Sequence, residues 1–391
     1  MDFELSEEQK SLQLLARKFA MEEMLPVVAE LEKRPDGEDK FAYDLVKRGA
    51  ALGFHSLGVP QAHGGDGASV LTQCIVMSEL SSGSPAVSKV YSHNWKAIAG
   101  LIAVANEEQL ARVIPDYLED PLYCIGIAIT EPNAGSDNAL PFDADPAAGP
   151  ALSAVRDGDS YVLNGMKQFI AMGAQAKYVT AFARTDRSVP WTKGVTGFML
   201  FPPHEGFEVG RLHEKVGLRC YPQHDLIFRD VRVPLENRLG EEDKFQEGRR
   251  SVVNVGTLEA TSTALGIAQR AYDLALGYAR ERVQGGKPII EHDLIGSLLL
   301  DMYTRLEASR TLLWRAAWGI DNGLNDQKLA RATKVLTVEM LNYMTMRTVE
   351  IWGGMGVMKD APVEKVHRDA IQLFHMGNTN QVNVLKALPH L

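Results

Sequence analysis

Two changes of residue pattern divide this sequence, and they constrain its fold more than any single motif. The first third has helical periodicity, with Leu12, Leu15 and Phe19 on one face, as expected of an amphipathic helix. From about residue 123 the sequence consists of short β-branched and aromatic segments between Gly, Pro and Asp, which is typical of strands. After about residue 237 the helical spacing returns. Doubly wound folds alternate strands with helices, so this order of blocks argues against them.

The blocks predict a multi-domain α+β protein. Residues 1–122 are expected to form an N-terminal helical domain, in which Ser6 and Gln9 match a capping box. Residues 123–236 are expected to form a small central antiparallel β-barrel, and residues 237–391 an antiparallel C-terminal four-helix bundle. The predicted strands cover residues 161–170, 177–185, 194–201 and 226–233, the last with a bulge or twist at Arg229–Asp230.

Composition limits the classes of function. The chain has 391 residues, 45% of them hydrophobic, and a net charge of −9, which argues against a general nucleic-acid binder. Its three cysteines show no metal-ligand spacing, so we expect no disulfide framework and no metal site. The first residues lack the pattern of a signal peptide, and apolar runs such as Leu298–Leu300 are too short to span a membrane. We therefore expect a cytoplasmic protein without a membrane span.

Motifs in all three blocks carry a family resemblance. In chain order they are AITEPNAGSD (128–137), LNGMKQFIAMG (163–173), RDVRVPLENRLG (229–240), GIAQRAYDLALGYARERVQGGKPIIEH (266–292), EIWGGMGVMKDAPVEKVHRDA (350–370) and LFHMGNTNQ (373–381). In identity, order and spacing they resemble the acyl-CoA dehydrogenase family over nearly the whole chain. The resemblance implies a helical domain, a β-barrel domain and a four-helix bundle that bind FAD and assemble as a dimer of dimers.

The retained residues suit a flavin nucleotide on chemical grounds. Thr130 and Ser136 flank a glycine-containing loop whose hydroxyl and N–H groups suit a pyrimidine edge or a phosphate. Gly353 and Gly354 end a helical run and allow a ligand to approach the backbone closely. Arg282 has a planar donor fork that suits phosphate, and the resemblance implies that it reaches the FAD of a neighbouring subunit.

The resemblance also assigns contacts residue by residue. The positions that it implies for FAD are Ile127, Ile129, Thr130, Ser136, Phe169, Ala171, Arg282, His292, Glu350, Gly353, Gly354 and Asn378. The positions that it implies for the acyl thioester are Ser136, Asn254, Thr257, His375 and Gly377.

The main departure from the family pattern is Met376, which stands where most members carry the catalytic glutamate. That carboxylate removes the α-proton of the thioester as hydride passes to the flavin, and a positioned base is worth about 10²–10⁴-fold in rate. A thioether does not accept this proton, although the backbone N–H of Met376 can still polarise the thioester carbonyl. A minority of members place the glutamate at the residue that matches Gly256, so this second site lacks a carboxylate as well.

Further departures surround the cofactor and the CoA channel. Ala171 lacks the hydroxyl that bonds flavin N5 in the family, and Glu350 replaces a glutamine and is a poorer neighbour for a diphosphate unless it is paired. The other substitutions are phenylalanine for tryptophan at Phe169, glycine for phenylalanine at Gly285, aspartate for glutamine at Asp293, and Asn254 and Thr257 for aspartate and arginine. We still expect FAD to bind.

Two residues are candidates to replace the missing base. Glu259 lies one helical turn after the second glutamate site and faces roughly the same way; alternatively, its charge is satisfied by neighbours or solvent. His375 adjoins Met376, and an imidazole ordinarily titrates near pH 6.5. His93 and Asn94 fall in the helix that caps the acyl cavity in the family, where they either read a polar substrate or serve packing.

Four functions follow as hypotheses. The first is an FAD-dependent dehydrogenase acting on an acyl-CoA or acyl-carrier-protein thioester, with a relocated base and an electron-transfer flavoprotein as a further partner. The second is a non-catalytic subunit of a heteromeric dehydrogenase whose sister chain supplies the glutamate. The third keeps the fold and flavin but performs lyase, desulfinase or flavin-monooxygenase chemistry. The fourth is a scaffold with a vestigial site, against which Thr130, Ser136 and Arg282 weigh.

Overall fold

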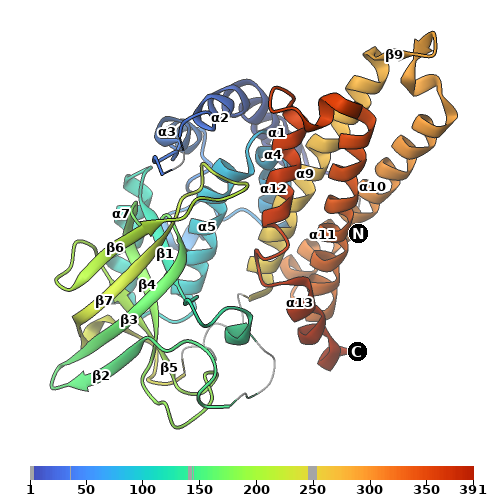
Figure 1. Ribbon diagram of the computed structural model, residues 1–391. Coiled ribbons are helices and arrows are strands. Elements are labelled where there is room, and N and C mark those ends of the chain that lie inside the picture. The colour runs from blue at the N-terminus through green and yellow to red at the C-terminus, as the bar shows by residue number, and fades with distance from the viewer. Residues whose placement is uncertain (1–3, 36, 140–142, 144, 245–252) are drawn as a thin grey trace.

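The computed structural model describes residues 4–35, 37–139, 143, 145–244 and 253–391. In these residues a helical part, a β part and a second helical part follow one another along the chain (Figure 1). The predicted fold class is therefore confirmed. The exact domain boundaries at residues 122 and 236 stay a prediction.

The N-terminal part is built from short helices around two buried ones. Ser6 and Gln9 form the predicted capping box at the start of the first helix, with both hydrogen bonds at 3.1 Å. The helices are α1 (Glu7–Lys18), α2 (Leu25–Leu31), α3 (Tyr43–Ala51), α4 (Val70–Gly83), α5 (Pro85–Ile102), α6 (Glu107–Ala111) and α7 (Ile114–Glu119), with a π-helical turn at Phe19–Met24 between the first two. α4 and α5 are buried along most of their length, so they link the two other parts.

The β part is one sheet in the order β6-β7-β3-β2-β4-β5-β8, with β1 added beside β4. Its strands are β1 (Cys124–Ala128), β2 (Ser153–Asp157), β3 (Ser160–Ala171), β4 (Ala176–Arg184), β5 (Val195–Leu200), β6 (Phe207–Leu212), β7 (Gln223–Pro234) and β8 (Arg238–Leu239). The four strands that the sequence predicted correspond to β3, β4, β5 and β7. The predicted bulge is present, since Asp230 has φ +51° and the β3–β7 register shifts between Leu163 and Gly165.

One detail of the sheet differs from the predicted antiparallel barrel. β1 runs parallel to β4, and β2 meets β4 in a single parallel pair at Ser153 and Arg184. The other strand pairs are antiparallel. Parallel neighbours need a long connection, and the β2–β3 hairpin lies between β1 and β4 in the chain. Neither β1 nor β2 was among the predicted strands, so their direction was not predicted either.

The C-terminal part consists of three long helices and two shorter ones. They are α9 (Val253–Glu281), α10 (Asp293–Asp321), α11 (Gln327–Trp352), α12 (Pro362–Gln372) and α13 (Asn380–Ala387). A small hairpin, β9 (Val283–Gln284) and β10 (Lys287–Pro288), joins α9 to α10. Figure 1 shows this hairpin at the end of the bundle that points away from the sheet.

The apolar core shows how the parts are held together. One cluster of buried residues joins α1, α4 and α5 to α9, α10 and α11. A second cluster lies between α5, α6, α7 and strands β1, β4 and β5, and a third fills the interior of the sheet. α5 contributes to the first two clusters, so it fixes the sheet relative to the bundle.

Candidate active site

The turn between α12 and α13 presents Met376, Gly377 and Asn378. Gly377 and Asn378 both have positive φ, +66° and +69°, a conformation that glycine and asparagine adopt most readily. The buried ammonium of Lys334 donates to the Asn378 carbonyl at 2.9 Å, and Asn383 donates to the Gly377 carbonyl at 3.1 Å. Two side chains, those of Lys334 and Asn383, therefore hold the backbone carbonyls of this turn in place.

Met376 is half-buried in this turn. Its side chain packs against the main apolar core, and its N–H donates to the Gln372 carbonyl over a long 3.3 Å. Gly377 lies against α9, because a Cβ built at residue 377 would be 3.0 Å from the Cβ of Ala260. The turn thus faces the first half of α9, which contains the predicted thioester positions Asn254 and Thr257.

The second predicted glutamate site, Gly256, is covered by a lysine. A Cβ built on Gly256 would lie 3.1 Å from Cδ of Lys96. The Lys96 ammonium is 4.0 Å from the carboxylate of Glu259. The aliphatic part of Lys96 thus occupies the space beside Gly256, and its ammonium lies near Glu259.

Glu259 is a buried, fully paired carboxylate. It forms an ion pair with Lys89, which is 2% exposed, and accepts a hydrogen bond of 2.5 Å from Ser92. Burial by itself raises the pKa of Glu259, but Lys89 and Lys96 outweigh burial and bring this pKa to about 2. A carboxylate that holds its charge so firmly is a weak proton acceptor, so this environment favours the alternative that its charge is satisfied by neighbours.

The space beside this pair is small. A cavity of about 20 Å³ lies between α4, α5 and α9, with Cys74, Met77, Ser92 and Glu259 in its wall. Such a volume holds about one water molecule. The space beside Glu259 is therefore short and partly polar.

The histidines near the pocket have different surroundings. His375 is exposed beside Met376, whereas His93 is buried, with Nε2 3.0 Å from the Ile125 carbonyl. Burial and the charges of Lys96 and Lys89 keep the pKa of His93 well below its usual range. Asn94 bonds both the carbonyl of Tyr123 and the N–H of Ile125. His93 and Asn94 thus tie α5 to β1, which matches the packing alternative.

The channel residues of α9 are buried. Asn254 donates to the Asn325 side chain at 2.5 Å, but its own Oδ1 is buried without a hydrogen-bond partner among the described residues. Thr257 is also buried and lies one turn further along α9. A buried amide oxygen without a partner costs free energy, so a donor from a bound ligand would stabilise this position.

The sheet presents an aromatic ring next to an alanine. Phe169 has φ +60° at an irregularity in β3, and its ring is 48% exposed. Ala171, two residues on, is buried against β7. Ile127 and Ile129, on and after β1, are half-buried nearby in the sequence, and the hydroxyl of Thr130 makes no hydrogen bond to a described residue.

Two buried polar pairs support this region and were not predicted. Lys167 is fully buried and ion-pairs with Glu131 at 2.7 Å, next to Thr130, while Glu131 also accepts the N–H groups of Ala151 and Leu152. The second pair is His213 with Asp225, whose atoms are 2.7 Å apart, and the His213 ring lies 4.6 Å from the ring of Phe169. The burial of Lys167 could have been predicted from the sequence, because Lys167 falls on the same alternating positions of the strand as the buried Tyr161 and Leu163. No comparable pattern in the sequence indicates the pair of His213 and Asp225.

The other predicted cofactor residues lie at the far end of the bundle. Arg282 follows α9 directly at the hairpin, and its guanidinium makes no hydrogen bond or ion pair within the described part of the chain. His292 precedes α10 and bonds the Gln284 carbonyl at 3.0 Å. Glu350 is paired with Arg347, which neutralises a charge that would oppose a diphosphate. Gly353 has φ +59°, and a Cβ on Gly353 or Gly354 would meet no described atom within 4 Å.

The predicted cofactor residues fall into two groups, called half-sites below. One comprises Phe169 and Ala171 on β3 and Asn378 in the α12–α13 turn, and the other comprises Arg282 after α9 and Gly353 after α11, at the hairpin end of the bundle. The exposed aromatic ring, the open glycines, the unpaired guanidinium and the free Thr130 hydroxyl fit an extended flavin dinucleotide. Ser136 is exposed at the start of a 3₁₀ turn on the sheet side.

Comparison with known proteins agrees with this arrangement. The family model for the acyl-CoA dehydrogenase N-terminal domain matches residues 6–120, that for the middle domain matches residues 126–231, and that for the C-terminal domain matches residues 250–385. The chain is 34% identical over 379 residues to the caffeyl-CoA reductase-Etf complex subunit CarC of Acetobacterium woodii, covering 96% of each chain. It is 33% identical to the mitochondrial short-chain specific acyl-CoA dehydrogenase of Bos taurus, covering 99% of this chain and 91% of the relative.

Solved structures are similar over the whole length. Butyryl-CoA dehydrogenase from Megasphaera elsdenii superposes with a TM-score of 0.91 at 29% identity, covering 100% of this chain and 99% of that one. The glutaryl-coenzyme A dehydrogenase glutaryl-CoA complex superposes with a TM-score of 0.90 at 28% identity, covering 100% and 96%.

The fold and the two half-sites define a flavin-dependent oxidoreductase that acts on CH–CH bonds, with FAD as its cofactor. The chain belongs to the acyl-CoA dehydrogenase family, since models of all three domains of that family match it. No helix in the described part of the chain is both long enough and apolar enough to cross a membrane.

Proposed function

We propose that the protein oxidises or otherwise transforms an acyl-CoA thioester at its flavin without a carboxylate at residue 376. The observation that carries this proposal is the turn at Met376, Gly377 and Asn378, which is rigidly supported and faces α9 but offers a thioether to the pocket. The fold and the retained cofactor residues support flavin chemistry, while the turn points to a different way of handling the α-proton.

The chain's own residues would bind and orient the thioester. The Met376 N–H now spans a long 3.3 Å to Gln372, so exchanging this contact for a thioester carbonyl costs little. The unpartnered Oδ1 of Asn254 would accept an N–H from the pantetheine arm. The FAD, when bound, supplies the hydride acceptor. A short pocket with Glu259 and Lys96 in its wall would favour a short or polar acyl group.

Proton transfer is assigned to His375 in this proposal. His375 is adjacent to Met376 and exposed, and its ring makes no hydrogen bond to a described residue. Glu259 is unsuited to this role, because Lys89 and Lys96 hold its pKa at about 2. The favoured substrate class is then an acyl thioester whose α-proton is more acidic than that of a saturated acyl chain, since the exposed His375 is placed beside residue 376 and not at it.

Assembly and partners follow from the two half-sites. The Arg282 end of the bundle lies away from the Phe169 face of the sheet (Figure 1), so a second copy would be needed to complete each flavin site. This supports a homo-oligomer, with a dimer of dimers as the proposed state. The name of the relative CarC places that protein in a complex with Etf, and we propose an electron-transfer flavoprotein as the partner of this chain too.

The test is an anaerobic titration of the purified, FAD-loaded protein with acyl-CoA thioesters. The proposal predicts bleaching of the oxidised flavin band with at least one short or polar thioester. A His375→Gln variant should slow this bleaching, and a Met376→Glu variant should accelerate it with ordinary saturated acyl-CoA. Flavin that stays oxidised with every thioester, in the wild type and in Met376→Glu, would refute the proposal.

The alternative of a non-catalytic subunit has one observation in its favour. The described acid near the turn, Glu259, is already neutralised by lysines, so a sister chain would have to supply a free carboxylate. Turnover by the purified chain without any partner would exclude this alternative. Oxygen-dependent product formation with an added reductant would instead favour monooxygenase chemistry.

A further inference from the structure

A large cavity lies between the N-terminal and C-terminal helices, away from the candidate active site. It has a volume of about 960 Å³ and is walled by α2, the junction of α4 and α5, the middle of α9, the start of α12 and the loop at residues 215–219. Arg270 marks its position on α9, ten residues beyond Ala260, where the turn of Met376 packs. Ten helical residues span about 15 Å. The cavity is therefore separate from the acyl pocket.

The cavity is strongly basic in a protein that is acidic as a whole. Eight lysine and arginine residues and four acidic residues line it, whereas the whole chain has a net charge of −9. Local excess charge in a concave site concentrates ions of the opposite sign. The identity of the paired and unpaired cations then decides whether this excess is available to a ligand.

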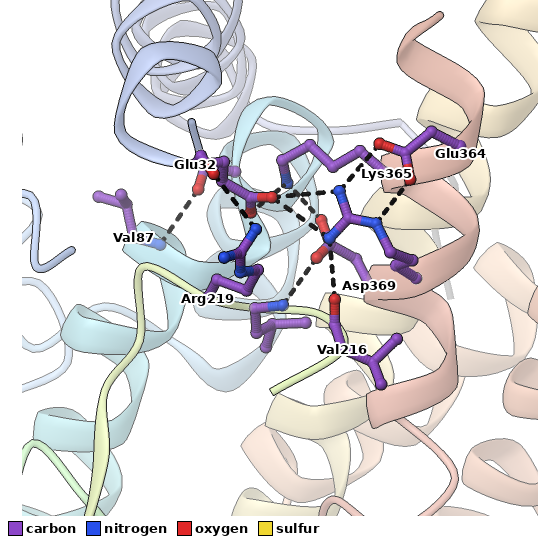
Figure 2. Close-up of polar contacts among 10 residues, drawn as sticks. Glu32, Val87, Val216, Arg219, Glu364, Lys365 and Asp369 are labelled. Carbon is purple, nitrogen blue, oxygen red and sulfur yellow. Dashed lines mark hydrogen bonds and ion pairs between the residues drawn. The ribbon is translucent and has the colours of Figure 1, made fainter. Parts of the chain in front are cut away.

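Most of the acids in the wall are used within the protein. Glu32 at the end of α2 contacts Lys365 and Arg368 of α12, each at 3.3 Å, and Arg219 donates to the backbone carbonyl of Glu32. Figure 2 shows these side chains converging from α2, α12 and the 215–219 loop.

The two acids of α12 complete this network. Glu364 binds Arg368 at 2.6 Å, and Asp369 binds Lys365 at 2.5 Å and accepts the N–H of Leu218 at 2.7 Å. These contacts neutralise Glu32, Glu364 and Asp369 against the cations of the same wall. Asp360 is the remaining acidic residue in the lining. Lys33 is paired with Glu30 outside the lining, whereas Arg270 and Lys359 make no hydrogen bond or ion pair with a described residue.

Arg270 is the clearest of these surplus cations. It projects from α9 into the cavity and makes no hydrogen bond or ion pair with any residue that the structure describes. Burial lowers the pKa of Arg270 and the charge of Arg17 adds to this effect, whereas the nearby Asp273 raises this pKa. An anion in the cavity would supply the half-buried guanidinium with an acceptor.

Two further features add donors to the same space. α12 has eleven residues and begins in the cavity, and its N-cap residue Ala361 offers no side-chain cap. Pro362 has no N–H and Glu364 stands in the first turn, paired with Arg368, so the N–H groups after Pro362 and the positive end of the helix dipole are what this helix adds for an anion. Lys215 reaches the cavity with its ammonium bound to the Tyr221 carbonyl at 2.6 Å. Burial lowers the pKa of Lys215 to about 7, which a bound anion would reverse.

We propose that this cavity binds a small phosphate-bearing molecule with at least two negative charges. The volume is within the range of pockets for small ligands. The forked guanidinium of Arg270, the neighbouring cation Lys359 and the uncapped start of α12 match the recognition of phosphate oxygens by cationic side chains and helix N-termini. This site is independent of the acyl thioester and of the proposed reaction.

The test is calorimetric titration of the FAD-loaded wild type with pyrophosphate and, separately, with ADP in phosphate-free buffer. We expect binding by the wild type and at least about a tenfold loss of affinity in Arg270→Gln, because one charge-assisted contact is removed. The control is Arg229→Gln, which makes the same charge change at an exposed residue of β7 and should bind as the wild type does. Lys359→Gln, also in the cavity lining, serves as a second variant if Arg270→Gln fails to fold.

The outcomes separate the proposal from its rivals. Equal binding by Arg270→Gln and Arg229→Gln, or no binding by the wild type, overturns the site. Competition between pyrophosphate and acyl-CoA, together with a raised KM for the thioester in Arg270→Gln, would place the cavity within the thioester site and also overturn it. Because binding is measured without turnover, the result does not depend on which reaction the protein catalyses.

Discussion

Two buried ionic clusters differ in the number of their charged residues and in the size of the cavity beside them. Near the Met376 turn, Glu259 of α9 is held by Lys89 and Lys96 of α5 beside a cavity of about 20 Å³. At the junction of α2 and α12, Glu32 joins a network with Lys365 and Arg368 beside a cavity of about 960 Å³. In the first cluster the pair of Lys89 and Glu259, called the closed pair below, is almost completely buried, and the more exposed Lys96 is 4.0 Å away. The second cluster, called the open network below, has more members and borders the large cavity.

This difference determines how each cluster responds when one partner is lost. In a closed pair, an uncompensated charge has no water to solvate it, so removing one partner is strongly destabilising. In an open network, remaining partners and water take over part of the lost interaction. The closed pair should therefore dominate the stability of the protein, whereas the open network leaves a surplus of charge for binding.

The largest effect is expected for Lys89→Met. This change keeps the side-chain volume but leaves the buried carboxylate of Glu259 with Lys96 at 4.0 Å and the Ser92 hydroxyl as its nearest partners. We expect the free energy of unfolding to fall by about 3–5 kcal/mol, measured by urea denaturation. The double variant Lys89→Met with Glu259→Gln should recover part of this loss. An equal loss in the single and double variants would contradict the account of a closed pair.

The next effect is the pH dependence contributed by Glu259. Its pKa is lowered from 4.5 to about 2 in the folded protein, so this pair contributes stability above about pH 4.5 and loses it as pH falls toward 2. The contribution is about 3 kcal/mol, from 1.36 kcal/mol per pKa unit. Unfolding free energies from about pH 6 to about pH 3 should therefore fall more steeply in the wild type than in Glu259→Gln. Parallel curves would show that the carboxylate is not preferentially stabilised by folding.

A smaller effect is expected for Glu32→Gln in the open network. The amide retains one acceptor for Lys365 or Arg368. Asp369 stays in contact with Lys365, and Glu364 stays in contact with Arg368. We expect a loss of about 1–2 kcal/mol in the free energy of unfolding. The same variant should strengthen pyrophosphate binding, because one negative charge leaves the wall. A loss as large as that of Lys89→Met would show that the network behaves as a closed cluster.

The smallest effect sets the baseline for an exposed pair. Arg229 and Glu208 are 2.7 Å apart, with side chains 69% and 54% exposed. Surface pairs of this kind contribute roughly 0–1 kcal/mol, so Arg229→Gln should leave the thermal midpoint almost unchanged. A larger shift would mean that the differences measured at the two buried clusters contain a general effect of charge removal.

The sequence predicted the order of the three parts because periodicity is a local property. The strands at residues 161–170 and 226–233 were predicted from alternating residues and turn signals, and both formed. The direction of β1 was not predicted, because β1 is short and its partner β4 lies about fifty residues further on. The relative direction of two paired strands depends on the connection between them, and the residue pattern within each strand does not determine that connection.

The candidate site was only partly predictable for the same reason. The resemblance located Met376 and Gly256, but not the fate of Glu259, whose partner Lys89 is 170 residues away in the sequence. The contact between Glu32 and Arg368 spans 336 residues. Charges in otherwise apolar helices, such as Lys89 in α5, signal a buried partner, yet the sequence does not identify that partner.

The position of Lys96 beside Gly256 affects where a glutamate base could be regained by substitution. A glutamate introduced at residue 256 would meet the stem of Lys96 within 3.1 Å of its Cβ and would pair with that ammonium before it reached a substrate. A glutamate at residue 376 would stand in a turn that already has its supports and meets no such cation among its described hydrogen-bond partners. One substitution would therefore place a free carboxylate at residue 376, whereas at residue 256 the lysine would have to change as well.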